Sequence, residues 1–184
     1  MNASLTASLR LRPTIEPDLP AVVEILQSTV DWYRPFTDPD DLATQHAVDL
    51  SWARENFEQR EFWSATIDGE VVGVLTLQDA GDVLYLGYVY VHEDFVGNRI
   101  GRRLLDHAAA QAVARGKRGM VLISHPEATW AVKAYTKYGF ECIADTDEAV
   151  RAWNDRWLAT YHEQGFHLWQ WSVERLASAR PGEA

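Results

Sequence analysis

The stretch VHEDFVGNRIGRRLLDHAAAQAVARG, residues 91–116, contains the first of the two motifs on which the fold prediction rests. It begins as the end of an apolar strand, turns through Gly97 and Gly101, and continues as a helix with one apolar stripe. Glycines at a strand-to-helix turn often let backbone amides approach a phosphate, which the positive end of the helix dipole also attracts. Val96 and Arg99 stand inside this turn, so the residues alone allow either a phosphate-binding turn or a plain one.

Strands and helices alternate on both sides of this stretch. Apolar periodicity predicts strands at 9–14, 62–67, 71–78, 83–91, 119–124, 140–144 and 166–176, and helices at 17–26, 42–60, 100–115, 124–138 and 147–163. Two prolines, Pro35 and Pro39, and several aspartates indicate a loop at 31–41. Asp68-Gly69 is typical of a tight hairpin, and Gly87 suggests a bulge. Ser124 and Glu127 have the spacing of a capping box that opens a helix.

Hairpins mixed with strand–helix–strand units indicate an α/β (α+β) fold with one mixed sheet and helices on its faces. The length of 184 residues suits a single domain, which we place at 9–176 between flexible ends at 1–8 and 177–184.

Composition narrows the classes of function. The 17 basic and 27 acidic residues give a net charge of −10, which disfavours a nucleic-acid partner, including a role as a DNA-binding regulator, and is permissive for cationic small molecules. The single cysteine, Cys142, excludes an internal disulfide, and no Cys/His cluster has metal-site spacing, so no metal is expected. No apolar run approaches the roughly 18–20 residues that span a bilayer, and the N-terminus does not look like a signal peptide. We therefore expect no membrane partner and a cytoplasmic protein.

Two stretches resemble the GNAT superfamily of acyl-CoA-dependent N-acyltransferases. In the first, residues 96–101, the glycines and Ile100 fit the family's pyrophosphate-binding turn, although Val96 stands where the family has Gln or Arg and Arg99 where it has Gly. The second, ATWAVKAYTKYGFE at 128–141, matches a later helix of the family through Ala131, Tyr135, Lys137, Gly139 and Phe140. Ala128 replaces an asparagine that is frequent there. The resemblance implies the GNAT fold, with a mostly antiparallel sheet.

The resemblance implies a site for acetyl-CoA as the acyl-donor cosubstrate. The backbone amides of the turn would bind its pyrophosphate; the residues are Gly97, Asn98, Arg99, Ile100, Gly101 and Arg102. In the family a backbone N–H on the fourth strand stabilises the oxyanion, which places this group between Val89 and Val91.

Catalytic candidates follow from the same resemblance. Tyr135 falls where the family often has a tyrosine that protonates the departing thiolate, while the alternative is a tyrosine of the core. The general base is not legible from the sequence. Asp82, His92, Glu93 and His125 are candidates, and a water chain is the alternative to all of them. His125 follows the fifth strand and an imidazole ordinarily titrates near neutral pH, but a histidine at a helix start is more often structural.

In the family, the first two helices, their loop and the last hairpin form the acceptor side of the site. Here these are residues 28–60 and 145–170. The first segment mixes acids with Trp32, Tyr33 and Trp52, which either attracts a cationic amine or forms a solvated surface over core aromatics. The resemblance implies an N-acetyltransferase that acts on a primary amine of a small molecule or peptide by direct attack in a ternary complex. The alternative is a non-catalytic acyl-CoA-binding module, and a homodimer is open in either case.

Overall fold

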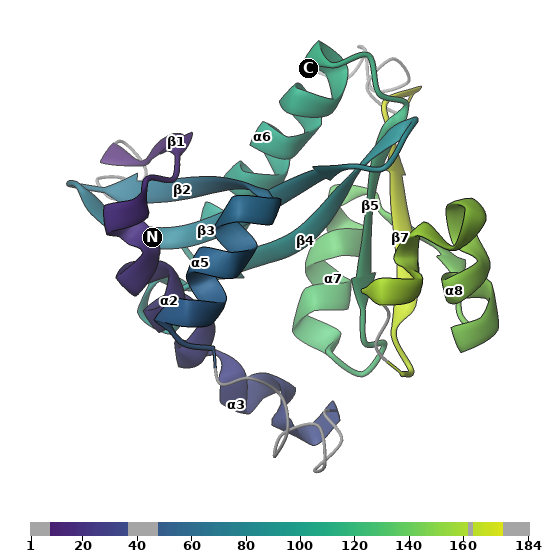
Figure 1. Ribbon diagram of the computed structural model, residues 1–184, viewed down its shortest axis with the longest axis horizontal. Coiled ribbons are helices and arrows are strands. Elements are labelled where there is room, and N and C mark those ends of the chain that lie inside the picture. The colour runs from purple at the N-terminus through teal and green to yellow at the C-terminus, as the bar shows by residue number, and fades with distance from the viewer. Residues whose placement is uncertain (1–7, 37–47, 162–163, 175–184) are drawn as a thin grey trace, which may run out of the picture. The chain divides into compact units, whose positions relative to one another are not determined.

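The computed structural model describes residues 8–36, 48–161 and 164–174 (Figure 1). The strands are β1 (Arg10–Pro13), β2 (Glu61–Ile67), β3 (Glu70–Asp79), β4 (Val83–Val91), β5 (Gly119–Ser124), β6 (Glu141–Ala144) and β7 (His167–Ser172). The α-helices are α2 (Leu19–Ser28), α3 (Val30–Tyr33), α5 (Leu50–Gln59), α6 (Ile100–Ala114), α7 (Thr129–Tyr138) and α8 (Asp147–Arg156). Short 3₁₀ turns are η1 (Glu16–Asp18), η2 (Arg34–Phe36), η3 (Glu93–Phe95) and η4 (Trp157–Thr160).

The seven strands form one sheet in the order β1-β2-β3-β4-β5-β7-β6. The pairs β1–β2, β2–β3, β5–β7 and β6–β7 are antiparallel, and β4–β5 is parallel. This confirms the expected mixed, mostly antiparallel sheet with helices beside it. The chain divides into two compact units, the first from Met1–Gln78 and Gly87–His107, the second from Asp79–Leu86 and Ala108–Ala184. The single domain at 9–176 stays a prediction.

The core of the first unit forms where α2 and α5 lie on β2 and β3 (Figure 1). Apolar residues spaced three and four apart on α2 meet apolar residues of the two strands; the buried ones are Val22, Ile25, Leu26, Phe62 and Val74. The predicted hairpin between β2 and β3 is present, and both of its turn residues, Asp68 and Gly69, have positive φ, at 51° and 93°.

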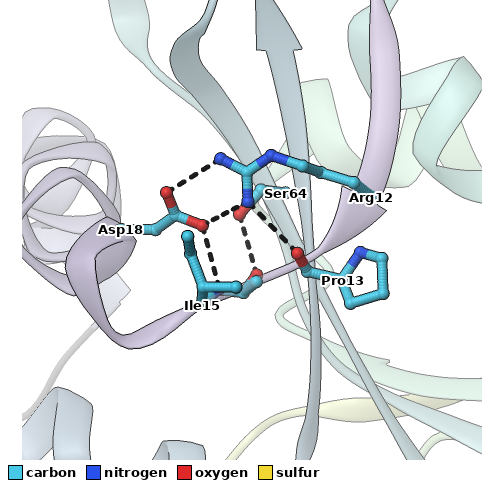
Figure 2. Close-up of polar contacts among 6 residues, drawn as sticks. Arg12, Pro13, Ile15, Asp18 and Ser64 are labelled. Atoms are coloured by element: carbon cyan, nitrogen blue, oxygen red, sulfur yellow. Dashed lines mark hydrogen bonds and ion pairs between the residues drawn. The ribbon is translucent and has the colours of Figure 1, made fainter.

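A polar network ties the start of the chain to this unit (Figure 2). Two nitrogens of the Arg12 guanidinium donate to the Asp18 carboxylate at 2.5 and 2.9 Å, and the Ile15 amide donates to the same carboxylate at 2.9 Å. The Thr14 and Ser64 hydroxyls lie 2.8 Å apart beside it. The side-chain hydrogen bonds from Arg12 hold the pKa of Asp18 below its ordinary value of 3.8.

Asp18→Asn should lower the free energy of unfolding by about 1–3 kcal/mol near neutral pH, because it removes the carboxylate that satisfies Arg12. A depressed pKa means that Asp18 stabilises the fold above the unfolded-state pKa, and that this contribution is lost as pH falls through the lower folded-state pKa. Urea unfolding of wild type and Asp18→Asn should therefore show a difference in the free energy of unfolding that is constant above about pH 5 and disappears in acid.

The control for that prediction is Asp82→Asn, which removes an exposed ion pair with Arg118 and should change stability little. A gap between wild type and Asp18→Asn that stays constant into acid would contradict the assigned role.

The second unit packs both faces of its strands. On one face, residues of β4, β5 and β7 meet α8 and η4; the buried members include Tyr85, Val121, Val150, Leu158 and Leu168. On the other, Tyr138 of α7 lies against Trp171 of β7, with ring centroids 6.2 Å apart, and Figure 1 shows α7 and α8 on opposite sides of β5 and β7. β7 is paired on both edges, so its backbone offers no open edge to a second subunit.

Several element boundaries differ from expectation. The expected loop at 31–41 contains α3 and η2 as far as residue 36. The helix expected at 147–163 has non-helical backbone at Trp153–Asp155, with positive φ at Asn154, Asp155 and Arg156, where the Asn154 side-chain amide donates to the Ala80 carbonyl at 3.0 Å. The terminal segments expected to be flexible and residues 42–47 of the second expected helix lie almost wholly outside the described residues.

The capping box at Ser124 and Glu127 is absent. Ser124 ends β5 opposite His167, and α7 starts only at Thr129. Pro126 disfavours helical backbone at the residue before it, so the helix begins later than the serine predicts. Its N-cap position is held by Ala128, which makes no side-chain cap.

Candidate functional site

The turn that leads from β4 into α6 has an unusual backbone path. After η3, Val96 is extended with φ −62° and ψ 146°, and its side chain is exposed. Gly97 and Arg99 then both adopt positive φ, at 88° and 62°. Between them, the backbone amide and the side-chain amide of Asn98 donate to the Phe95 carbonyl at 3.4 and 3.1 Å, and these bonds hold the turn closed.

The start of α6 has two features that favour an anion at a helix N-terminus. Its backbone ladder begins where the Arg103 amide donates to the Arg99 carbonyl at 3.1 Å, so the amides of Arg99, Ile100 and Gly101 precede the ladder. No acidic residue lies in the first turn of the helix. The amides that precede the first intrahelical hydrogen bond and the positive end of the α6 dipole together favour phosphate binding at the start of this helix.

Packing fixes the position of this helix start. Ile100 is 2% exposed, and a Cβ added at Gly73 would lie 3.2 Å from its Cγ2 and 3.1 Å from the Tyr90 carbonyl oxygen. Gly73 thus lets β3 approach both β4 and α6 closely. At Gly101 an added Cβ would meet only Val91 Cγ2, at 3.9 Å, so alanine would fit there as well.

Arg99 is a non-glycine residue in the left-handed region. This conformation costs a side-chain-bearing residue about 1–2 kcal/mol and costs glycine almost nothing. The side chain is exposed, and Arg99 therefore brings both local strain and a positive charge to the turn.

Arg99→Gly should raise the free energy of unfolding by about 1 kcal/mol, because it relieves that strain. Arg99→Ala keeps the strain while removing the charge, so it should match wild type in stability. Chemical unfolding of the three proteins measures the strain, and acetyl-CoA affinity of the alanine variant measures the charge. Equal stability of the glycine and alanine variants would show that residue 99 carries no strain.

The second half of β4 lies beyond its pairing with β5, which covers Val83–Tyr85. Further along, the Tyr88 amide donates to the Thr76 hydroxyl of β3 at 2.9 Å. This contact lies directly after Gly87, where a bulge stays a prediction. Val89 and Val91 follow, both half-buried, and Val91 faces α6.

The structure gathers part of the predicted site in the first unit. Val89, Val91, Glu93 and residues 97–102 all belong to it, whereas His125 and Tyr135 belong to the second unit. Glu93 is exposed and its amide donates to the Ser28 hydroxyl at 3.2 Å. Arg102 lies 3.8 Å from Asp106 across one turn of α6, on the exposed face of the helix.

Tyr135 and His125 have defined surroundings in the second unit. The half-buried ring of Tyr135 packs edge-on against Phe140, with centroids 5.7 Å apart. His125 Nδ1 accepts from the Glu127 amide at 3.3 Å, and its ring lies edge-on to Phe166 at 5.5 Å. The His125 side chain therefore helps to form the turn before α7. This contact fits the structural alternative given above for His125.

Sequence reasoning missed a group of side chains around the second half of β4. The centroid of the Tyr88 ring lies 5.5 Å from that of Trp52 of α5 and 6.1 Å from that of Tyr90. The Arg60 guanidinium carbon lies 5.0 Å from the centroid of the Tyr88 ring. The available signal was the alternation in YVYV, which places Tyr88 and Tyr90 on one face of the strand and the valines on the other.

No group of three or more His, Cys, Asp or Glu side chains with metal-site geometry occurs within residues 8–36, 48–161 and 164–174. In the same residues, no helix has the length and apolar character needed to cross a membrane.

A model of the Acetyltransferase (GNAT) family matches residues 26–140, more than half of the 184-residue chain. The chain therefore belongs to the GNAT family of acetyltransferases, and acyl transfer is its class of reaction.

Solved structures agree on the fold. The chain is similar to the PaiA N-acetyltransferase from Thermoplasma acidophilum, solved with coenzyme A, at a TM-score of 0.68 and 18% identity over 90% of this chain and 99% of that one. It is similar to the ribosomal-protein-S18-alanine N-acetyltransferase from Escherichia coli, at a TM-score of 0.65 and 17% identity over 95% of this chain and 97% of that one. It is also similar to an acetyltransferase from Thermus thermophilus, at a TM-score of 0.67 and 15% identity over 90% of this chain and 97% of that one. At these identities the likeness concerns the fold alone.

Proposed function

We propose that the protein transfers an acetyl group from acetyl-CoA to a primary amine of a small molecule or peptide. The observation that carries the proposal is the turn at Gly97–Gly101, where two positive-φ residues present the start of α6 with amides that precede its ladder. These amides suit the pyrophosphate of acetyl-CoA, and the family's reaction supplies the class of chemistry. The family match favours this enzyme over a non-catalytic acyl-CoA-binding module.

The reaction proceeds by direct attack. The neutral amine nitrogen bonds to the thioester carbon, negative charge develops on the carbonyl oxygen, and a backbone N–H between Val89 and Val91 stabilises it. The carbon–sulfur bond then breaks, the amine loses a proton, and the thiolate gains one. We assign the second proton to Tyr135, on its place in the family motif. The candidates for the general base are Asp82, His92, Glu93 and His125.

Binding and chemistry can be tested separately. Acetyl-CoA and CoA at millimolar concentration should each raise the melting temperature, since a ligand that binds only the folded state stabilises it. Release of free thiol from acetyl-CoA across a panel of amines then measures transfer. No thermal stabilisation by either ligand would overturn the assignment of the turn, while stabilisation without thiol release from any amine would favour the non-catalytic module.

A further inference from the structure

The segment that joins α8 to η4 in the second unit contains a left-handed turn built without glycine. Asn154, Asp155 and Arg156 follow one another with φ of 48°, 53° and 68°. Left-handed backbone is unfavourable for a residue that has a side chain, although Asn and Asp tolerate it better than arginine does. Strain of this kind persists where surrounding contacts impose it. The contacts of this segment therefore decide its conformation.

Two hydrogen bonds hold the chain in this shape. The Asn154 side-chain amide donates to the carbonyl of Ala80, which lies in the turn between β3 and β4, at 3.0 Å. The Gly165 amide donates to Asp147 Oδ1 at 2.9 Å and so ties the chain just before β7 to the first residue of α8. The first bond fixes the left-handed turn, and the second fixes the return of the chain after it.

The local sequence also suits a different conformation, one unbroken helix. Residues 147–160, DEAVRAWNDRWLAT, contain neither glycine nor proline, and the Thr146 hydroxyl caps their start by accepting from the Ala149 amide at 3.3 Å. Val150, Trp157 and Leu158 pack in one apolar cluster, and their spacing of seven and eight residues would keep them on one face of a continuous helix. Their burial therefore does not by itself choose between the broken and the unbroken helix.

The two conformations differ in where they leave Gly165. A continuous helix from Asp147 to Thr160 would rise about 20 Å. The chain from there to Gly165 spans about 17 Å at full extension. It could return to Asp147 only as a fully extended strand along the helix, so we assign the hydrogen bond between Gly165 and Asp147 to the broken form.

The return of the chain also covers His125. A Cβ added at Gly165 would lie 3.3 Å from His125 Nε2, and the Phe166 ring lies edge-on to the imidazole with centroids 5.5 Å apart. Both residues stand next to the bond between Gly165 and Asp147. Loss of that bond would therefore free the chain that packs against the imidazole.

We propose that residues 153–156 are a conformational switch that controls access to His125. In one state the left-handed turn holds Gly165 and Phe166 over the imidazole, and in the other a continuous helix over residues 147–160 releases them. The strain at Arg156 opposes the first state and the two hydrogen bonds favour it, which is the balance that a two-state element requires. The inference does not depend on the proposed function, because it concerns access to His125 and not its role.

Arg156→Gly tests the switch without removing a contact. The Arg156 side chain is exposed and makes no hydrogen bond or ion pair with any residue that the structure describes. Glycine relieves the strain of the covered state, so hydrogen exchange at the Gly165 amide, measured by NMR, should slow about tenfold. Local fraying of the chain around Gly165 would not respond to residue 156.

Urea separates the switch from global unfolding, which would also respond to residue 156. Global unfolding exposes the whole core and is promoted by urea, whereas the switch exposes little surface. In wild type, exchange at Gly165 should therefore be faster than at the buried Val121 of β5 and nearly independent of low urea concentrations.

Asn154→Ala should shift the equilibrium the other way, because alanine loses the bond to Ala80 and favours a helix. Exchange at Gly165 should accelerate about tenfold, and NMR contacts between residues three apart should appear across 153–157. Carbethoxylation of His125 by diethyl pyrocarbonate should accelerate relative to that of His92. The exposed Thr160→Ala gains helix propensity and leaves both hydrogen bonds intact, so this matched control should stay near wild type.

The Arg156→Gly measurement decides the proposal even if Asn154→Ala does not fold. Unchanged exchange at Gly165 in Arg156→Gly would overturn the switch, as would wild-type exchange at Gly165 that is as slow and as dependent on urea as at Val121. A folded Asn154→Ala that exchanges at Gly165 as slowly as wild type would also overturn it. Faster exchange in that variant without the helical contacts would show that the chain is released without a continuous helix, which contradicts the second state.

Discussion

Tyr135→Phe should lower kcat by about a hundredfold or more while leaving acetyl-CoA binding unchanged. The substitution removes only the hydroxyl that we assign to protonating the departing thiolate. The ring keeps its edge-on contact with Phe140 at 5.7 Å, so the helix and its packing should persist. Steady-state thiol release gives the rate, and the thermal shift with acetyl-CoA gives the binding.

Tyr138→Phe is the matched control for that experiment. Tyr138 lies on the same helix and loses the same hydroxyl, while its ring contacts with Phe140 and Trp171 remain. Its turnover should stay near that of wild type. Equal turnover in the Tyr135 variant and the control would leave Tyr135 as a core tyrosine, whereas a parallel loss of acetyl-CoA binding would indicate a positioning role.

Element order could be predicted from the sequence because it follows from local patterns. Each strand and long helix among the described residues overlaps a segment whose apolar periodicity indicates it, including the helix after Gly97. The hairpin at Asp68-Gly69 follows from its turn residues. Boundaries were less predictable. At 31–36, Pro35 and Asp31 suggested a loop, but Asp31 pairs with Arg34 three residues later and supports a short helical turn.

The conformation of Arg99 could not be predicted, because an arginine does not specify positive φ. It adopts that conformation because the packing of α6 outweighs a local cost of about 1–2 kcal/mol; Ile100 and Leu104 are 2% and 0% exposed. The pairing of Arg60 with Tyr88 was equally inaccessible, because the two residues are brought together only when α5 packs beside β4. The predicted phosphate-binding turn depends on local sequence, whereas the contact between Arg60 and Tyr88 depends on tertiary packing.

Gly119→Ala should destabilise the protein by about 3 kcal/mol or more, the largest effect on stability that we expect from a single methyl group. Gly119 opens β5, buried between Val83 of β4 and Ser172 of β7. An added Cβ would overlap the Trp171 carbonyl oxygen and lie 3.1 Å from the carbonyl carbon. These are backbone atoms, so no rotamer change relieves the overlap, and either β7 shifts or the strands separate.

The same substitution at two other glycines gives the scale for this result. Gly73→Ala meets atoms at 3.1–3.4 Å and should cost less, while Gly101→Ala meets one side-chain carbon at 3.9 Å and gains helix propensity. Chemical unfolding should rank the losses as Gly119, then Gly73, then Gly101. Gly119 pairs with Val83 in the parallel pairing of β4 with β5. The substitution should therefore also disturb the first half of β4, which precedes Val89. If Gly119→Ala were as stable as Gly101→Ala, the close approach of β5 to β7 at Trp171 would be wrong.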